Sequence, residues 1–351
     1  MRPTIRRRRA VLAGALLALC FPLLTIGGIS LYMALHPKAR FGFTERPPKT
    51  VEIPARTSAR EAAARLEAEG IIPNQWLFLV LAALRRTADT LKAGEYQFTA
   101  GMGVLDVLEA MEEGRVILHR VTIPEGATAR DVAALLHQEG LADRDRFLAL
   151  VSDPAFASQV DPEATMLEGY LFPDTYYFTK GLREETIIEK MVARFFRSFP
   201  LEEEIRGRSL GMTRHEIVTL ASIVEREAVT EEEKPIIAAV FHNRLKRKML
   251  LQADPTVLYG RGKPLSSRIT YGDLKSSRNP YNTYVHPGLP PGPIANPGES
   301  ALRAVLYPAD VGYLYFVSKN DGTHHFSKSF AEHDRAVRRY QLGLGRRAAG
   351  G

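Results

Sequence analysis

The residues best suited to catalysis lie in one short stretch, from Thr213 to Ala228. Thr213 followed by Glu216 is a capping box, in which the hydroxyl and the carboxylate each satisfy a free backbone N–H at a helix start. Apolar residues then recur at helical spacing and place Glu225 on, or at the edge of, the face that turns inward. A carboxylate among apolar neighbours is costly to ionise, so its pKa rises and it can serve as a general acid. The alternative is a helix-edge glutamate that reaches past the core to water.

Two other carboxylates, Glu227 and Glu168, are rivals of Glu225, and Asp254 has a separate role. Glu227 falls on another face of the same helix, next to Arg226, where ordinary surface pairing is expected. Glu168 lies in an aromatic turn, which favours sugar contact or loop hydrogen bonding over acid catalysis. Asp254 precedes a proline and either orients a substrate or caps a turn.

Polar and aromatic side chains later in the chain are candidates for ligand binding. Gln252, Asn282 and Tyr284 offer amide hydrogen bonds and an aromatic plate, which are groups that a sugar ligand would use. The alternative for the tyrosine is core packing, because aromatic side chains are often largely buried. The histidines have no H-E-x-x-H spacing and no cysteine joins them, so we expect neither a catalytic metal nor a cofactor.

The charge distribution indicates a membrane rather than a nucleic acid as partner. The net charge is +7, but five arginines precede residue 10, in a tail and not on a folded surface. Residues 10–35 carry no charge and are long enough to cross a bilayer. The preceding arginines predict a cytoplasmic N-terminus and an exported remainder. Alternatives are a cleaved signal peptide, a twin-arginine signal, and a lipoprotein signal at Cys20, the only cysteine.

An internal repeat organises the first half of the exported part. Val51–Pro54 and Val121–Pro124 begin two similar segments, 70 residues apart. Each segment predicts a short strand ending at proline, a helix N-cap at Ser58 or Thr128, and an amphipathic helix closed by glycine. The repeat therefore predicts small α+β units.

Periodicity predicts further elements on both sides of the Thr213–Ala228 helix. A Pro/Gly-rich loop at 288–298 is flanked by apolar segments, and loops of this kind often carry function. We expect helices near 74–84, 104–113, 143–151, 184–199, 232–247 and 300–306, and strands near 94–98 and 313–318.

Several blocks, in order along the chain, carry a resemblance to a known family. They are Glu168–Tyr176, Ala221–Glu227, Phe241–Leu245, Leu251–Gly260, Tyr281–Tyr284, Gly288–Gly298 and Tyr313–Val317. On these residues the chain resembles the MltG (YceG-like) family of membrane-anchored endolytic murein transglycosylases, from the anchor to about Tyr340. One departure is Ala253, where the family pattern has threonine.

The resemblance implies a catalytic glutamate in the Ser-Ile-Val-Glu block, which is Glu225, and a LysM-like fold before the catalytic domain. Lytic transglycosylases cut the bond between N-acetylmuramic acid and N-acetylglucosamine without water. One acid protonates the leaving oxygen, and the C6 hydroxyl of the muramic acid closes a 1,6-anhydro ring. Because that nucleophile is already held close, one carboxyl group suffices where hydrolases need two.

We therefore expect an endolytic transglycosylase of nascent peptidoglycan glycan strands that terminates glycan elongation. Synthases in the membrane are expected partners, and nucleic acid is not. The alternatives are a non-catalytic, membrane-anchored peptidoglycan-binding scaffold and a water-using glycoside hydrolase.

The expected fold class is α+β, in a single-pass protein of the inner membrane whose catalytic domain lies in the periplasm. The expected parts are a basic cytoplasmic tail (1–9), a transmembrane helix (10–35), a linker (36–50), a LysM-like subdomain (51–120), a second repeat-like α+β segment (121–160), a catalytic domain (161–342) and a flexible tail (343–351).

Overall fold

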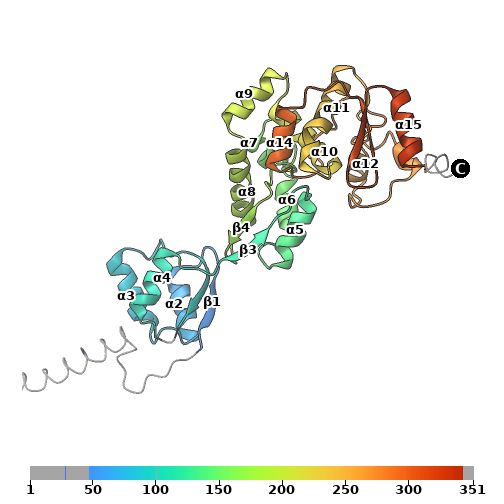
Figure 1. Cartoon of the computed structure of the whole chain (residues 1–351). Coiled ribbons are helices and arrows are strands. Elements are labelled where there is room, and N and C mark those ends of the chain that lie inside the picture. The colour runs from blue at the N-terminus through green and yellow to red at the C-terminus, as the bar shows by residue number, and fades with distance from the viewer. Residues whose placement is uncertain (1–27, 29–46, 100, 343–351) are drawn as a thin grey trace, which may run out of the picture. The chain divides into compact units, whose positions relative to one another are not determined.

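The computed structural model describes residues 28, 47–99 and 101–342. These residues fall into two compact units: one extends to His119 and includes Thr179–Leu182, and the other comprises Arg120–Phe178 and the chain from Arg183 onward (Figure 1). The second repeat-like segment thus folds together with the expected catalytic segment. The basic tail, the expected membrane span, most of the linker and the C-terminal tail lie outside the described residues. Within the described part, no helix has the length and apolar character needed to cross a membrane.

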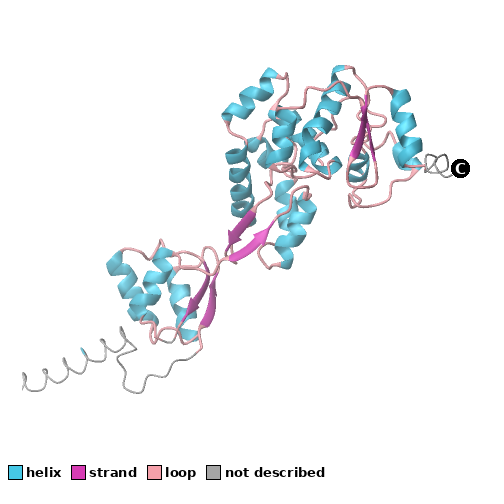
Figure 2. Cartoon of the chain, in the orientation of Figure 1, coloured by secondary structure: helices cyan, strands magenta, loops and turns pink. Residues whose placement is uncertain are grey.

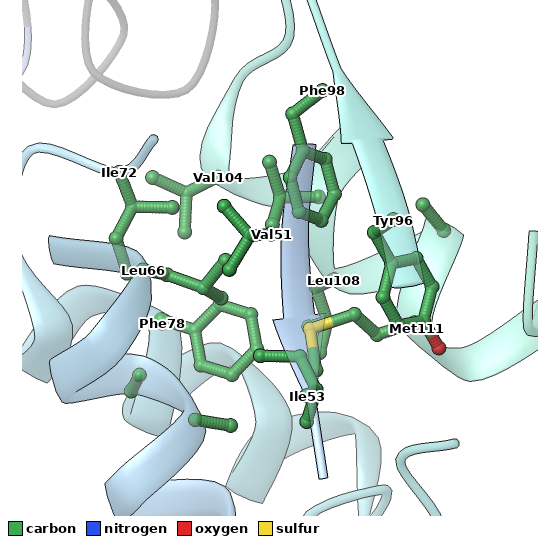
Figure 3. Close-up of a cluster of buried hydrophobic side chains, with 14 of the residues drawn as sticks. Val51, Ile53, Leu66, Ile72, Phe78, Tyr96, Phe98, Val104, Leu108 and Met111 are labelled. Atoms are coloured by element: carbon green, nitrogen blue, oxygen red, sulfur yellow. The ribbon is translucent and has the colours of Figure 1, made fainter. Parts of the chain in front are cut away.

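The first unit packs three helices against a two-stranded sheet. Its elements are β1 (Lys49–Ile53), α2 (Ala59–Ala68), α3 (Gln75–Arg85), β2 (Gly94–Phe98) and α4 (Val104–Glu113). β1 and β2 are antiparallel, with Val51 opposite Tyr96, and alternate residues of both strands point into the core. Figure 3 shows this core, in which Leu66 and Phe78 from the helices have no exposed surface.

The second unit is mostly helical, with two small sheets (Figure 2). β3 pairs with β4 and β5 with β6. Helix α10 is central, because it packs against α9, α11, α12 and α14 and every residue from Ile217 to Val224 is buried. The elements are β3 (His119–Thr122), α5 (Ala129–Gln138), α6 (Arg144–Val151), α7 (Pro154–Val160), β4 (Thr175–Phe178), α8 (Glu184–Ser198), α9 (Leu201–Ser209), α10 (Arg214–Glu227), the 3₁₀ turn η2 (Glu231–Glu233), α11 (Lys234–Lys246), α12 (Asp254–Gly260), α13 (Tyr271–Leu274), α14 (Glu299–Leu306), β5 (Tyr315–Ser318), β6 (His324–Ser327) and α15 (Phe330–Tyr340).

The structure confirms the α+β class and the common design of the two repeats. Ser58 and Thr128 each form a capping box at the start of a ten-residue helix. Gly70 and Gly140 follow those helices with φ of 68° and 66°, a left-handed conformation that costs glycine little. Strand β2 and helix α4 have the bounds that periodicity predicts.

Several short elements were not predicted. α12 has seven residues, too few for a helical period to be recognised, and it begins at a proline-containing turn. His324 and His325 belong to β6, which pairs antiparallel with β5. α15 begins with a capping box at Ser329 and Glu332, a sequence signal that could have identified it.

Candidate functional site

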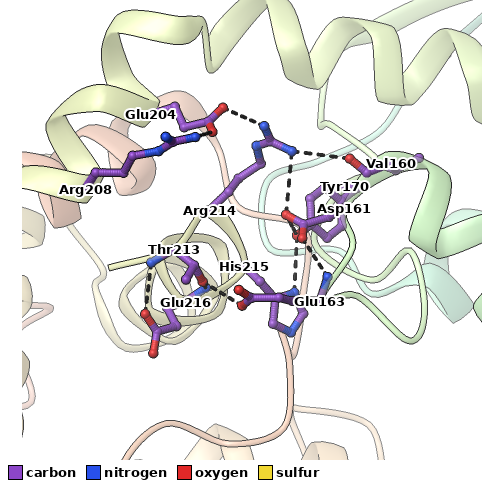
Figure 4. A network of polar contacts seen from close by, with 10 residues as sticks. All are labelled: Val160, Asp161, Glu163, Tyr170, Glu204, Arg208, Thr213, Arg214, His215 and Glu216. Carbon is purple, nitrogen blue, oxygen red and sulfur yellow. Dashed lines mark hydrogen bonds and ion pairs between the residues drawn. The ribbon is translucent and has the colours of Figure 1, made fainter. Parts of the chain in front are cut away.

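The N-terminal end of α10 is fixed by the polar network in Figure 4. Thr213 caps the helix with Glu216, as the sequence predicts, and its hydroxyl donates to Glu163 at 2.8 Å. Arg214 pairs with Glu204 at 2.5 Å. His215 lies between the Tyr170 hydroxyl and the carbonyl oxygen of Pro291, at 3.2 Å from each. These contacts hold α10 in a defined position relative to the Pro/Gly-rich loop.

The Pro/Gly-rich loop is tied to the interior of the second unit by Asn296, which has no exposed surface. Its Oδ1 accepts from the backbone N–H groups of Gly169 and Leu171, at 2.9 and 3.0 Å. Its Nδ2 donates to the carbonyl of Ala127 and to Glu168, at 2.9 and 3.1 Å. One amide therefore joins three separate chain segments. Apart from the presence of an asparagine within the loop, no sequence signal identifies this role.

Of the two roles expected for Glu168, sugar contact and loop hydrogen bonding, its contacts match the second, and 1% of its surface is exposed. Its carboxyl group accepts from the N–H of Ala129 at 2.9 Å and from the hydroxyl of Tyr259 at 3.1 Å, in addition to Asn296. Burial raises the pKa of Glu168 to about 8. In this conformation Glu168 supports the loop from inside and cannot contact a glycan.

The raised pKa of Glu168 predicts a pH-dependent stability. The folded state holds the Glu168 proton up to about pH 8, whereas an unfolded chain releases it near the ordinary value of about 4.3. We therefore expect this carboxyl group to lower the free energy of unfolding as the pH rises between those values, and to have no further effect above them. Urea unfolding of the full chain and of Glu168→Gln at about pH 5 and pH 8 measures this. The glutamine variant is expected to lose less stability across that interval, and an equal loss in both proteins would contradict the prediction.

Glu225 is enclosed as the sequence predicts, with 8% of its side chain exposed, but its neighbours are not only apolar. Its Oε1 lies 3.1 Å from the ammonium of Lys234, and its Oε2 accepts from the N–H of Gly298 at 3.0 Å. Gly298 is the N-cap of α14, where the helix dipole attracts a negative charge. These contacts engage both oxygens of the Glu225 carboxyl group, so its surroundings combine the apolar neighbours that the sequence predicts with a cation and a backbone donor.

Lys234, which sequence reasoning missed, is the centre of this cluster. It is 3% exposed and contacts Glu231 and the hydroxyl of Ser300, each at 2.7 Å, and Glu125 at 3.6 Å. Burial lowers the pKa of Lys234, but the hydrogen bond to Glu231 and the charge of Glu225 outweigh it and raise the pKa overall. The cluster joins the C-terminal end of α10 to the N-terminal ends of α11 and α14.

Glu227, the last residue of α10, lies in different surroundings although it is only two residues from Glu225. It is partly buried. Burial and the nearby charge of Asp254 raise its pKa to about 8, against the opposing effect of Arg244 and Arg226. The free carbonyl groups at the end of a helix also disfavour a negative charge there. Glu227 is therefore a candidate general acid, because its raised pKa keeps a proton on the carboxyl group at neutral pH.

Two loops bring predicted sugar-binding residues to the Glu227 end of α10. Asp254 begins α12, which packs on α10, and accepts from the Tyr284 hydroxyl at 2.5 Å. Thr283 joins the two loops. Its hydroxyl oxygen accepts a hydrogen bond from the N–H of Ala253 at 2.9 Å, and its carbonyl oxygen accepts one from the N–H of Gln252 at 3.1 Å. Gln252 and Asp254 are exposed and Tyr284 is partly exposed, so all three are available to a ligand.

Asn282, the remaining predicted sugar ligand, is fully buried. Its amide nitrogen donates to the carbonyls of Asp273, Leu274 and Ser276, at 3.2, 3.0 and 3.0 Å. Its side-chain oxygen accepts from the N–H of Tyr284 at 3.0 Å. Every polar atom of the amide is thus engaged inside the protein, and Asn282 shapes the Tyr284 loop rather than contacting a ligand in this conformation.

Arg244 completes the surroundings of Glu227. Its guanidinium donates to the carbonyls of Leu314 and Leu251, both at 2.7 Å, and it lies over the ring of Tyr315. Only 7% of this residue is exposed. A neutral carboxyl group, a neighbouring carboxylate and a fixed cation can together donate a proton and stabilise developing charge.

The same arrangement of sequence and fold occurs in known proteins. Residues 51–339 match the YceG-like family. The endolytic murein transglycosylase of Bacillus subtilis (strain 168) is 33% identical over 336 residues, which cover 90% of this chain and 91% of that protein. The enzyme of the same name from Streptococcus pneumoniae (serotype 2, strain D39) is 33% identical over 321 residues, 82% of this chain but 57% of the relative.

A crystal structure of a yceG-like protein from Listeria monocytogenes is also similar. It is 35% identical in sequence, with a TM-score of 0.57, and the match covers 83% of this chain and 99% of that one. The family match over most of the chain, together with relatives of this identity and coverage, establishes the assignment: this chain belongs to the YceG-like family.

Proposed function

We propose that this protein is an endolytic murein transglycosylase in which Glu227 is the general acid. The proposal is supported by the names of its relatives in Bacillus and Streptococcus. The observation that carries the assignment of the acid is the position of Glu227 at the end of α10 beside Asp254 and Arg244, where burial raises its pKa to about 8. Glu225 is less suitable, because its two carboxyl oxygens are already engaged by the ammonium of Lys234 at 3.1 Å and by the N–H of Gly298 at 3.0 Å.

In the proposed reaction Glu227 donates its proton to the oxygen that links N-acetylmuramic acid to N-acetylglucosamine. The C6 hydroxyl of the muramic acid attacks C1 as the bond breaks, and the Glu227 carboxylate then accepts the proton of that hydroxyl. No water is consumed, and the product carries a 1,6-anhydro ring. Because the nucleophile belongs to the sugar itself, one acid–base group is sufficient.

The neighbours of Glu227 have separate proposed roles. The carboxylate of Asp254 is suited to stabilise the positive charge that develops on the sugar ring. Tyr284 holds that carboxylate through its 2.5 Å hydrogen bond. Burial and the charge of Asp254 raise the pKa of the Tyr284 hydroxyl, so it remains a donor. Gln252 is exposed beside Asp254 and can hydrogen-bond to sugar hydroxyl or acetamido groups.

The remaining parts of the proposal concern the substrate and its place in the cell. The substrate is the nascent glycan strand of peptidoglycan, cleaved internally so that elongation ends. The uncharged run at 10–35 would anchor the protein in the inner membrane, with its folded units in the periplasm near the synthases. The first unit would be LysM-like, in keeping with the strand–helix design of its repeat.

Mass spectrometry of the products tests this function. The full chain, purified in detergent, is incubated with nascent glycan polymer, and the masses of the new ends are measured. A transglycosylase gives ends that are lighter by one water than those of a hydrolase. Hydrolytic ends would replace the proposal with a water-using glycosidase, and an intact polymer would favour a non-catalytic scaffold.

A further inference from the structure

Helix α3 of the first unit exposes an uncharged apolar face. Trp76, Val80 and Leu84 are 57%, 55% and 76% exposed. A spacing of four residues places them along one side of the helix. Residues 75–84 contain no charged side chain. The opposite side of α3 packs into the core through Phe78, so the fold of this unit does not account for the outer face. A helix that is apolar on all sides is normally covered on all sides.

Cationic side chains border this face at both ends. The guanidinium of Arg60 lies 5.6 Å from the centre of the Trp76 ring. Arg85, which also pairs with Glu112 at 2.9 Å, and Arg86 follow the last apolar turn, and both are exposed. An apolar helix face with a tryptophan and bordering arginines is typical of helices that lie in a membrane interface. There the rings and arginine stems contact acyl chains while the charges reach phosphate groups.

The chain itself brings this face near a bilayer. The uncharged run at 10–35 is long enough to span a membrane, and the first strand begins at Lys49. A fully extended linker between residues 36 and 48 reaches about 45 Å at most. An anchor at 10–35 would therefore hold the start of the first unit within about 45 Å of the lipid surface, where a weak apolar contact is favoured by its high local concentration.

We propose that the outer face of α3 docks on the bilayer that anchors the chain, with Trp76, Val80 and Leu84 entering the boundary between headgroups and acyl chains. This docking rests on the proposed membrane anchor, but it is independent of the chemistry at Glu227. It holds the first unit against the lipid surface.

The emission of Trp76 tests the docking directly, because it is the only tryptophan in the chain. The full chain is reconstituted into phospholipid vesicles, with and without lipids that carry a doxyl quencher near the headgroup. If α3 docks, the tryptophan emission is blue-shifted and the doxyl lipid quenches most of its intensity. Aqueous iodide then quenches this emission much less than it quenches the emission of free N-acetyltryptophanamide. Vesicle flotation, measured on the same samples, reports the anchor separately.

Two matched variants distinguish docking from general proximity. Leu84→Glu places a charge on the apolar face at a site that does not support the fold, and it is expected to reduce doxyl quenching several-fold. Leu118→Glu changes another exposed leucine of the same unit, outside α3, and should leave the quenching unchanged.

Protein that floats with vesicles but shows free iodide access and no doxyl quenching would overturn the docking. Protection of Trp76 from iodide that changes with protein concentration and not with lipid would also overturn the docking, because it would indicate that a second copy of the chain covers this face. Protein that does not float would overturn the anchor and the docking together.

Discussion

Replacing Glu227 with glutamine is expected to lower the rate of glycan cleavage by roughly 10²–10⁴-fold, the usual contribution of a general acid. Glutamine has the same shape as the neutral carboxyl group, so the fold should be unaffected, but it has no proton to donate. The rate is measured as the release of anhydro-ended glycans by the full chain, and circular dichroism checks that the variant is folded. The raised pKa adds a second observable: kcat/KM of the wild type should fall as the pH rises through about 8, where Glu227 loses its proton.

Glu225→Gln is the matched control. The two residues lie on the same helix, two positions apart, so the substitution is chemically identical in a different environment. We expect it to weaken the fold, because Lys234 loses a partner, while folded protein still cleaves glycan. If folded Glu225→Gln were inactive and Glu227→Gln kept the wild-type rate, the acid would be Glu225, as the Ser-Ile-Val-Glu resemblance implies.

Replacing Lys234 with methionine is expected to lower the free energy of unfolding by about 3–5 kcal/mol, the usual cost of leaving one member of a buried ion pair alone. Methionine keeps the length of the side chain but removes the charge. Glu231 can turn toward water because its side chain is 60% exposed, whereas Glu225 at 8% cannot. Urea unfolding of the full chain measures the loss.

A double variant and a surface variant test whether the loss of stability in Lys234→Met comes from the broken ion pair. In Glu225→Gln/Lys234→Met no charge is left alone at the pair, so much of the lost stability should return, as a double-mutant cycle would show. Lys246→Met changes an exposed lysine of the same helix and should alter stability by less than about 0.5 kcal/mol. A Lys234→Met variant as stable as Lys246→Met would mean that the ion pair does not support the fold.

Local sequence signals predicted most of the elements correctly. The capping boxes at Ser58, Thr128 and Thr213 are present. Alternation identified β2, and helical periodicity identified α4 and α10. These signals work because each depends on residues within four positions of one another, whose contacts are set by the geometry of the helix or strand itself. Short helices such as α12, with seven residues, contain too few turns for a periodic pattern to be recognised, so they were not predicted.

The site was predicted only in part. Asp254, Gln252 and Tyr284 do lie together, because Thr283 joins their two loops across about thirty residues of sequence. Glu168 and Asn282 have suitable polar groups, but both are buried and fully engaged with the protein. The type of a residue indicates which groups its side chain can bind. It does not indicate whether other parts of the protein already form hydrogen bonds with that side chain.

The sequence by itself determined that α10 carries a carboxyl group on its inward side, and that the chain has an α+β fold of a recognisable family. Only the tertiary structure decided what surrounds the two glutamates of this helix. Lys234 and the N–H of Gly298, which is 73 residues away, contact the two oxygens of Glu225, whereas burial and the charge of Asp254 raise the pKa of Glu227. The ionisation of a carboxyl group depends on charges and dipoles within a few ångströms, and those come from segments that no local periodicity connects.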